Sequence, residues 1–334
     1  MNTSTNSNSI DKQIVARQHA LHRLGHTVPD YMTGQDALQE ANLLGWDVRK
    51  LDLRSTELSP EGVTEVTMPE RKMLVRTNPN NQQVEPLDIV GKDYHIFHAE
   101  ELVEFLDTLV DESSAHYNFA GSSHGGRCVF VGMELPQHLT IGGVDAVDLN
   151  LVARTWHGTG ALTVAATPIR LACSNMLDVA LGRGTTGKFR VTHRVGMNTR
   201  LQVAREALQI GWSYAEEFEV MAEAMIQTTV TEGQFMDIIR REFGPKDGAA
   251  PAGVTRAENM LDDLNALYFS EKNEGIVGTA WGAWQAFTEY ADHYSPVKAQ
   301  GRNESVVRAE KVAAGGMDSF KARALDLFRE PVLV

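Results

Sequence analysis

Apolar and polar positions in the N-terminal third of the chain predict short helices and strands in turn. Thr33 followed by Asp36 is a capping-box pattern, which predicts a short helix through Leu44. Residues 46–53 then alternate between apolar and polar positions like a strand, and residues 72–77 do so more weakly. The two further elements predicted here are a turn at 78–82 and a helix from Glu100 to Val110.

The middle of the chain is dominated by strand patterns. Residues 148–156 alternate clearly, the loop at 157–160 turns the chain, and residues 161–173 return as a long partner strand. The other elements predicted in this part are strands at 127–135 and 188–194 and a short helix from Asn175 to Leu181. Together these segments predict an antiparallel sheet that is built from hairpins.

The last part of the chain has helical patterns. Residues 198–228 contain no proline and predict one long helix. Capping-box patterns predict two further helix starts, at Thr231 with Gln234 and at Thr255 with Glu258. The remaining elements predicted here are a linker at 244–253 and helices at 278–294 and 305–328. The predicted fold class is therefore α+β, with a central antiparallel β-sheet and a helical C-terminal half.

These patterns divide the chain into four regions. The expected order is a disordered lead at 1–15, an N-terminal α+β region at 16–115, a β-sheet and helix core at 116–230 and a helical region at 231–334. No internal repeat is visible, so each region is expected to contribute different elements to the fold.

Composition places the chain among globular proteins with a substantial core, since 43% of its 334 residues are hydrophobic. No segment is a transmembrane candidate, because even the uncharged run 155–169 contains His157 and Pro168. The polar start lacks the apolar stretch of a secretory signal. Two cysteines make no disulfide framework and indicate a reducing compartment. We therefore expect a soluble cytoplasmic protein.

Charge is distributed unevenly along the chain, whose net charge is −13. Residues 149–205 carry eight basic side chains and one acid, Asp178, which gives a local charge of +7. The rest of the chain must then carry −20, because −13 minus +7 is −20. Such a segment either binds an anionic partner or pairs with the acids of the other regions.

The stretch "GRGTTGKF" (182–189) matches a phosphate-binding P-loop except at Phe189, where a Ser or Thr should bind magnesium. A P-loop connects a strand to a following helix, whereas the predicted order here is helix, glycines, strand. The stretch "GSSHGG" (121–126) matches a nucleophile elbow around Ser123, but a strand rather than a helix is predicted to follow it. It is better interpreted as a hairpin loop, with a Ser123 hydrolase as the remaining alternative.

Histidine and cysteine spacings do not form a ligand set. The three groups considered are His95 with His98, His19 with His22 and His26, and His124 with Cys128. Each lacks further partners at ligand spacing, so no metal and no cofactor is expected.

A row of cations is predicted on the strand at 188–194. Lys188 and Arg190 share one face of this strand, and Arg194 falls on the same side. The hairpin at 148–173 adds Arg154 and Trp156, a cation and an aromatic ring on which an unpaired base can stack. The alternative is that Trp156 belongs to the core and that the row pairs with acids. The candidate nucleic-acid-binding residues are Arg154, Trp156, Arg170, Arg183, Lys188, Arg190, Arg194 and Arg200.

The segment "TPIRLACSNMLDVAL" (167–181), followed by "FRVTHR" and a long helix, resembles the signature of a phage and plasmid-like family defined by a domain of unknown function, number 932. The matching motif residues are Arg170, Cys173, Asn175 and His193. Other similar pieces are "GGRCVFVGMELP" (125–136), "VDLNLVARTWHGTGAL" (147–162) and "GTAWGAWQAFTEYADHY" (278–294). Where members often have an Asn and an Asp-Gly turn, this chain has "TWHGTGAL".

The resemblance implies a role in the replication or recombination of mobile DNA. More distantly, the predicted hairpins and helix resemble single-strand annealing proteins of the Rad-fifty-two type, which bind DNA in a basic groove and assemble into rings or filaments. We therefore expect a non-catalytic protein that binds and anneals single-stranded DNA as a homo-oligomer. The alternative is a non-catalytic protein-binding factor that meets a host or phage protein through its acidic helical half, in one version as a DNA mimic.

Overall fold

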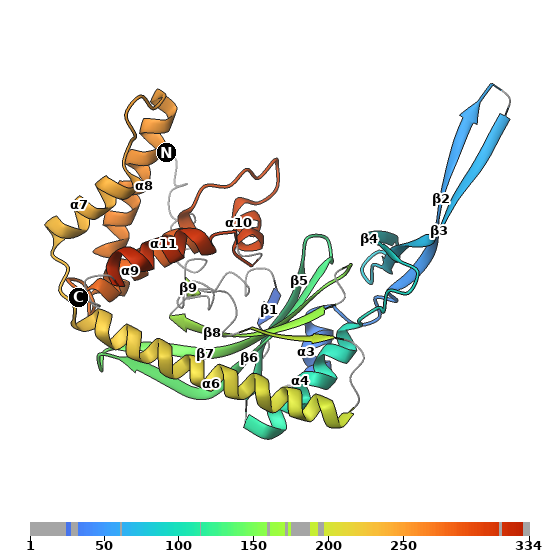
Figure 1. Cartoon of the computed structure of the whole chain (residues 1–334), viewed down its shortest axis with the longest axis horizontal. Helices are drawn as coiled ribbons and strands as arrows, with labels where there is room; N and C mark the ends of the chain where they lie inside the picture. The colour runs from blue at the N-terminus through green and yellow to red at the C-terminus, as the bar shows by residue number, and fades with distance from the viewer. Residues whose placement is uncertain are drawn as a thin grey trace, which may run out of the picture.

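Two antiparallel sheets and a C-terminal group of helices make up the molecule, which confirms the predicted α+β class (Figure 1). The structure is a computed structural model. It describes residues 25–27, 33–60, 62–113, 115–158, 161–170, 173–174, 188–192, 197–313 and 316–329. The predicted lead at 1–15 and the predicted helix from Asn175 to Leu181 lie outside these residues.

The larger sheet has seven strands, and its neighbouring strands are antiparallel. Its order is β1-β5-β6-β7-β8-β10, with β9 also paired to β8. The strand bounds are β1 Gly25–Thr27, β5 His116–Ser123, β6 Cys128–Ile141, β7 Asp145–Trp156, β8 Ala161–Arg170, β9 Cys173–Ser174 and β10 Lys188–Thr192. The hairpins predicted from alternation in the middle of the chain are therefore present, and β5 to β8 follow one another as a meander.

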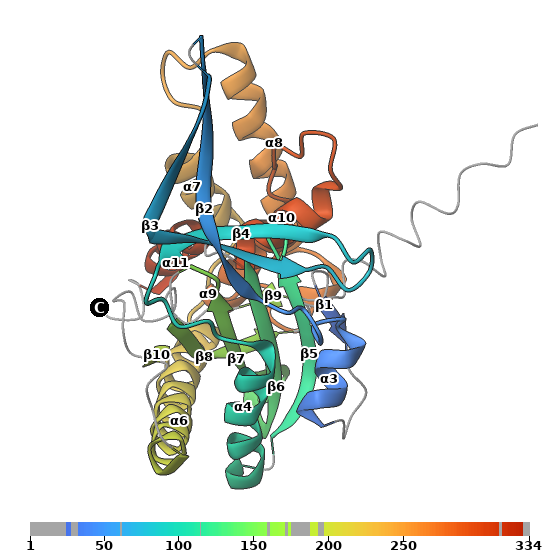
Figure 2. The same cartoon turned by 90° about the vertical axis from the view of Figure 1, so that its right-hand side faces the viewer.

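Helices cover one face of this sheet. They are α3 (Gly34–Glu40), α4 (Ala99–Ser113) and α6 (Met197–Gln227), and Figures 1 and 2 show α4 and α6 along the strands. Alternate residues of β6 and β7, such as Val131 and Leu151, are buried in the same core as side chains of α4 and α6. Alternation predicted β7 because one set of its side chains enters this core. Residues 128–133 of β6 are buried on both faces.

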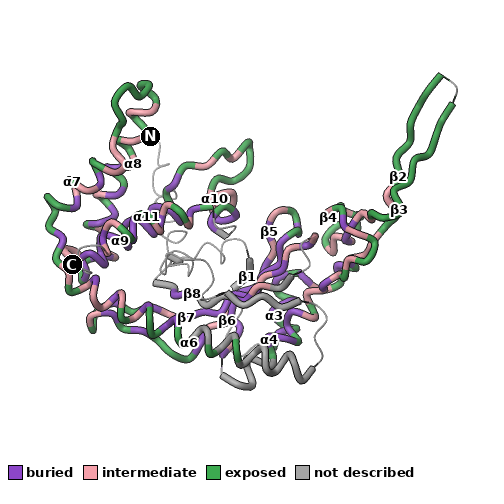
Figure 3. The backbone as a smooth tube through the Cα atoms, in the orientation of Figure 1, coloured by how far each residue is buried: buried purple, intermediate pink, exposed green. Residues whose placement is uncertain are grey.

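The smaller sheet consists of β2 (Arg49–Ser59), β3 (Gly62–Thr77) and β4 (Val84–Gly91). Beyond Asp52, β2 and β3 pair only with each other and project from the body as a two-stranded arm (Figures 1 and 2). Figure 3 shows the arm as exposed along its outer length. The sequence predicted only the bases of these strands, because a ribbon without a buried face does not need apolar alternation.

The C-terminal elements pack around a cluster of aromatic side chains. They are α7 (Glu232–Phe243), α8 (Pro251–Tyr268), η1 (Glu271–Asn273), α9 (Ala280–Glu289), the π-helix η2 (Tyr290–Tyr294), α10 (Glu304–Ala313) and α11 (Asp318–Arg329). Phe235 stacks on Tyr268 with ring centroids 4.2 Å apart, and it also contacts Phe287 and Phe328. None of the helices in the described residues combines the length and the apolar character that a membrane crossing requires.

Two of the three predicted capping boxes are confirmed, and the third is wrong, as is one predicted helix near the C-terminal end. Thr33 and Thr231 both form the predicted boxes. Thr255 does not start a helix, because α8 already begins at Pro251, a residue whose fixed φ suits a first helical position. The helix predicted at 305–328 is two helices, and the Gly316 N–H donates to the Lys311 carbonyl at 2.8 Å where the first one ends.

Candidate nucleic-acid interface

The face of the large sheet that points away from α4 and α6 is buried and apolar in its middle and carries polar side chains toward its two ends, and we call it the far face. Directly opposed residues of an antiparallel pair share a face, so the strand register identifies its members. They include Glu134 opposite Asn150, Phe130 opposite Arg154 and Cys128 opposite Trp156 on β6 and β7. In the middle, Phe119, Phe130 and Val152 form a small apolar cluster of their own. Polar groups lie at both ends of this cluster.

Arg154 and Trp156 lie together at one end of the far face. Both are half-buried, and the Trp156 ring lies 5.0 Å from the His124 ring, centroid to centroid. His124 belongs to the β5–β6 turn, where its φ is 54° and where Gly125 and Gly126 also have positive φ. This turn is the hairpin loop predicted for "GSSHGG", because β5 ends at Ser123 and β6 follows. A strand therefore stands where a nucleophile elbow requires a helix.

Cys128 lies beside this end of the far face, directly opposite Trp156. Burial raises the pKa of its thiol to about 11, against the opposing effects of the Arg154 charge and a hydrogen bond with Ser123. A raised thiol pKa keeps the group protonated near neutral pH. Cys128 is therefore a structural residue here and not a nucleophile.

The far face continues across β8 to β10. Thr163 of β8 lies opposite both Arg154 and Arg190, and Ala165 lies opposite both Val152 and Lys188. The register thus places Arg154, Lys188 and Arg190 on one face, across three neighbouring strands. Neighbouring strands are about 4.8 Å apart, so the backbones of Arg154 and Arg190 are about 10 Å apart. Arg194, the third member of the predicted cation row, lies outside the described residues, so the row itself stays a prediction.

A small cavity lies at the same end of the large sheet, where the smaller sheet meets β5. Its volume is about 200 Å³, and Asn42, Asn78 and Asn80 line it together with Gly121 and Ser122 of β5. Non-glycine residues with positive φ gather in the loops around it, namely Asn42, Asp47, Gln82 and His124. Such backbone conformations are uncommon and persist only where surrounding contacts hold them.

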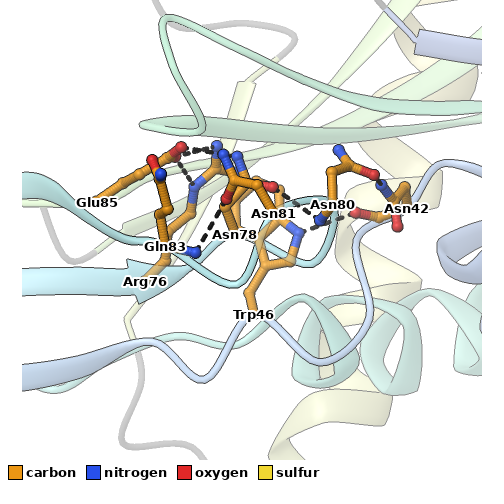
Figure 4. Close-up of polar contacts among 8 residues, drawn as sticks. All are labelled: Asn42, Trp46, Arg76, Asn78, Asn80, Asn81, Gln83 and Glu85. Carbon is orange, nitrogen blue, oxygen red and sulfur yellow. Dashed lines mark hydrogen bonds and ion pairs between the residues drawn. The ribbon is translucent and has the colours of Figure 1, made fainter.

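The polar groups around this cavity bond mainly to one another (Figure 4). Arg76 lies 4.0 Å over the Trp46 ring and donates two hydrogen bonds to Glu85, at 2.8 and 3.0 Å. Asn78 donates to the same carboxylate at 2.7 Å, and these bonds hold the pKa of Glu85 below its usual range. Asn42 donates to Asn80 at 2.6 Å. The network therefore joins β3, β4 and the turn between them to the loop after α3. Because these polar groups already bond to one another, the far face is the stronger candidate interface.

A family model described as "Domain of unknown function (DUF932)" matches residues 86–313 of the 334-residue chain. The chain belongs to the DUF932 family. This confirms the resemblance that the segment 167–181 and its companions predicted. Comparison with curated proteins and with solved structures gives no match. The DUF932 region runs from the end of the smaller sheet to α10, so it includes β5 to β10 but not the arm.

Only some of the DUF932 motif residues and of the other predicted nucleic-acid-binding residues belong to the part of the chain that the structure describes. Arg170 pairs with Cys173 between β8 and β9, and strand alternation places Arg170 on the face opposite to Arg154. Arg200 belongs to the first turn of α6. Arg183, Arg194, Asn175 and His193 lie outside the described residues. The far face thus keeps four of the predicted nucleic-acid-binding residues, namely Arg154, Trp156, Lys188 and Arg190.

Sequence reasoning missed a group of histidine and carboxylate side chains at the other end of the far face. Glu134, His138 and Asp148 each offer a ligand atom, and these atoms all lie within 4.8 Å of one another. Glu134 and His138 are four positions apart in sequence, which in a regular strand means about 13 Å. Only the Pro136 between them signals the bulge that brings them together.

Proposed function

We propose that this DUF932 protein binds single-stranded DNA along the far face and promotes annealing without a catalytic step. The observation that carries the proposal is the register that aligns Arg154, Lys188 and Arg190 beside Trp156. Cations that follow a nucleic-acid backbone release its counterions, and an aromatic ring stacks on unpaired bases. Annealing needs no catalytic residue, because base pairing supplies the free energy.

The first test is a salt titration of single-stranded DNA binding by the full-length protein. Replacing both Lys188 and Arg190 with Ala is expected to weaken binding to all sequences alike and to lower the slope of log K against log salt by about 1.4, about 0.7 for each lost contact with a single strand. The matched control is Arg241→Ala with Lys246→Ala, which removes the same charge from exposed positions of the C-terminal region.

Two outcomes would contradict the proposal at different levels. Absence of binding near 50 mM salt, or binding that salt does not change, would exclude DNA as the partner. Equal binding by the parent and the Lys188→Ala, Arg190→Ala protein would place the DNA elsewhere on the molecule.

We further propose that the arm joins copies of the chain into the homo-oligomer that annealing requires. Leu58 and Val63 pair directly near the tip, and they are 78% and 69% exposed. A two-stranded ribbon is marginally stable alone in water, so it gains stability from a covering surface. A second copy of this chain supplies one wherever the protein is concentrated on a strand of DNA.

Leu58→Lys is therefore expected to shift the protein toward the monomer in light scattering after gel filtration. Thr64→Lys is the matched control, because it adds the same charge to the neighbouring register position on the other face of the arm. A monomeric parent, or a Leu58→Lys protein with the parent's mass, would show that the arm does not join copies.

A further inference from the structure

The end of the far face remote from Trp156 carries a compact group of metal-ligand side chains. His138 Nδ1 lies 2.9 Å from Asp148 Oδ1, and the nearest Glu134 oxygen is within 4.8 Å of both ligand atoms. Two ligands of one metal ion, each at about 2.1 Å, lie no more than about 4.2 Å apart. Small rotations of these side chains would therefore place all three around one ion.

A bulge in β6 creates this group. Glu134 lies opposite Asn150 and His138 lies opposite Asp148, so residues 135–137 of β6 face the single residue Leu149 of β7. Pro136 lies in this bulge and is exposed, as expected for a residue that cannot donate to a strand ladder. Bulges of this kind redirect side chains and often lie beside functional sites. Here the bulge brings a carboxylate and an imidazole to the same end of the sheet.

Neighbouring side chains on β5 support Glu134. Asn118, the extra residue of a second bulge in β5, donates from Nδ2 to Glu134 Oε2 at 2.9 Å. His116 Nε2 lies 3.8 Å from the same oxygen. Hydrogen bonds to a ligand carboxylate fix its orientation and are a usual part of metal sites. Asn118 therefore acts as a positioning residue for Glu134.

Asn150 provides an independent indication of a missing partner. Its side chain is only 1% exposed, and its Oδ1 atom has no hydrogen-bond partner among the described residues. A buried amide oxygen without a partner is costly and calls for an unseen water or ion. The register places Asn150 directly opposite Glu134 and two residues after Asp148 on the same face. The residue that carries the unsatisfied oxygen is thus a direct neighbour of the group in the sheet.

We propose that the side chains of Glu134, His138 and Asp148 and the side-chain amide oxygen of Asn150 form a binding site for a divalent transition-metal ion. Imidazole with carboxylate and amide oxygens suits Zn²⁺ or Mn²⁺ better than Mg²⁺, which prefers oxygen ligands and retains its water. The side chains of His138 and Asp148 are 57% and 50% exposed, so an ion can enter from solvent and keep water or an anion as a further ligand. This inference does not rest on the proposed DNA binding.

A bound divalent cation would change the charge of the far face. Without it, Glu134 and Asp148 oppose the approach of phosphates at this end. With it, their two negative charges are offset, and the cationic character of the other end extends along the sheet. Metal binding and DNA binding can nevertheless be measured separately, so failure of one leaves the other standing.

The test is calorimetric titration of Zn²⁺, and of Mn²⁺ in parallel, into full-length protein that has been treated with a chelator. We expect one site per chain, and we expect His138→Ala and Asp148→Asn to weaken it at least 10-fold. Asn118→Ala is expected to weaken it 10- to 100-fold through the orientation of Glu134. The control is His98→Ala, which removes an imidazole outside the group and should retain the site.

Asn150→Leu separates ligation from folding. It should abolish the increase in melting temperature that Zn²⁺ gives the parent, while the metal-free protein stays at least as stable, because an unsatisfied buried oxygen has been removed. The proposal is overturned if neither metal binds with one site per chain, or if His138→Ala and Asp148→Asn bind as well as His98→Ala. Such a result would mean adventitious binding only.

Discussion

Replacing Lys321 with Met is expected to lower the free energy of unfolding by about 3–5 kcal/mol. Lys321 Nζ of α11 lies 2.5 Å from Asp292 Oδ1 of the π-helix η2, and both side chains are 0% exposed. Met fills a similar volume, so the main effect is to leave the Asp292 carboxylate buried without its cation. Removing one partner of a buried pair costs far more than the pair contributes net, because the remaining charge stays out of water. Urea denaturation followed by circular dichroism measures the loss.

The matched control is Lys92→Met, which breaks an exposed pair. Lys92 Nζ lies 2.9 Å from a Glu70 oxygen, with side chains 48% and 71% exposed, so its loss is expected to cost less than about 1 kcal/mol. Adding Asp292→Asn to Lys321→Met should recover part of the stability, because the uncompensated charge is then gone. Equal losses in Lys321→Met and Lys92→Met would show that this pair does not hold the C-terminal helices together.

Elements whose signals are local could be predicted from the sequence. A capping box needs only four consecutive residues, and the boxes at Thr33 and Thr231 form as expected. The strand β7 alternates in sequence, and one set of its side chains enters the core, whereas residues 128–133 of β6 are buried on both faces. By contrast, nothing local distinguishes the arm, since its length depends on β2 and β3 pairing with each other beyond the body of the sheet.

The candidate site could be predicted within single strands, but not where it depends on which strands are neighbours in the sheet. Alternation placed Lys188 and Arg190 on one face of β10, but their alignment with Arg154 depends on β10 pairing with β8. The Glu134–His138–Asp148 group needs both a bulge and a cross-strand register, and neither has a fixed sequence signature. Nearness in sequence was also misleading for Arg170. It lies close to the other cations in the chain, but strand alternation places it on the opposite face of the sheet.

His157 begins the turn after β7 and is buried with both ring nitrogens lacking a hydrogen-bond partner among the described residues. Its ring lies 6.5 Å from the Trp46 ring, on which the Arg76 guanidinium stacks. Burial lowers the pKa of His157 from 6.5 to about 4, and the positive charges of His98 and Arg76 act in the same direction. The folded protein therefore keeps this imidazole neutral where the unfolded chain would protonate it.

Stability should consequently fall with pH on account of His157. Between pH 6.5 and about 4 the unfolded chain binds a proton at this residue that the folded chain does not, so the free energy of unfolding decreases as pH falls and levels off below about 4. The difference between the two pKa values corresponds to about 3 kcal/mol, at about 1.4 kcal/mol for each unit. His157→Leu is expected to remove this loss, whereas Thr155→Val, a buried neighbour that does not titrate, should retain it. Urea denaturation of the three proteins at pH 7, 5.5 and 4 decides the matter, and parallel curves for His157→Leu and the parent would mean that the buried ring is protonated in the folded state.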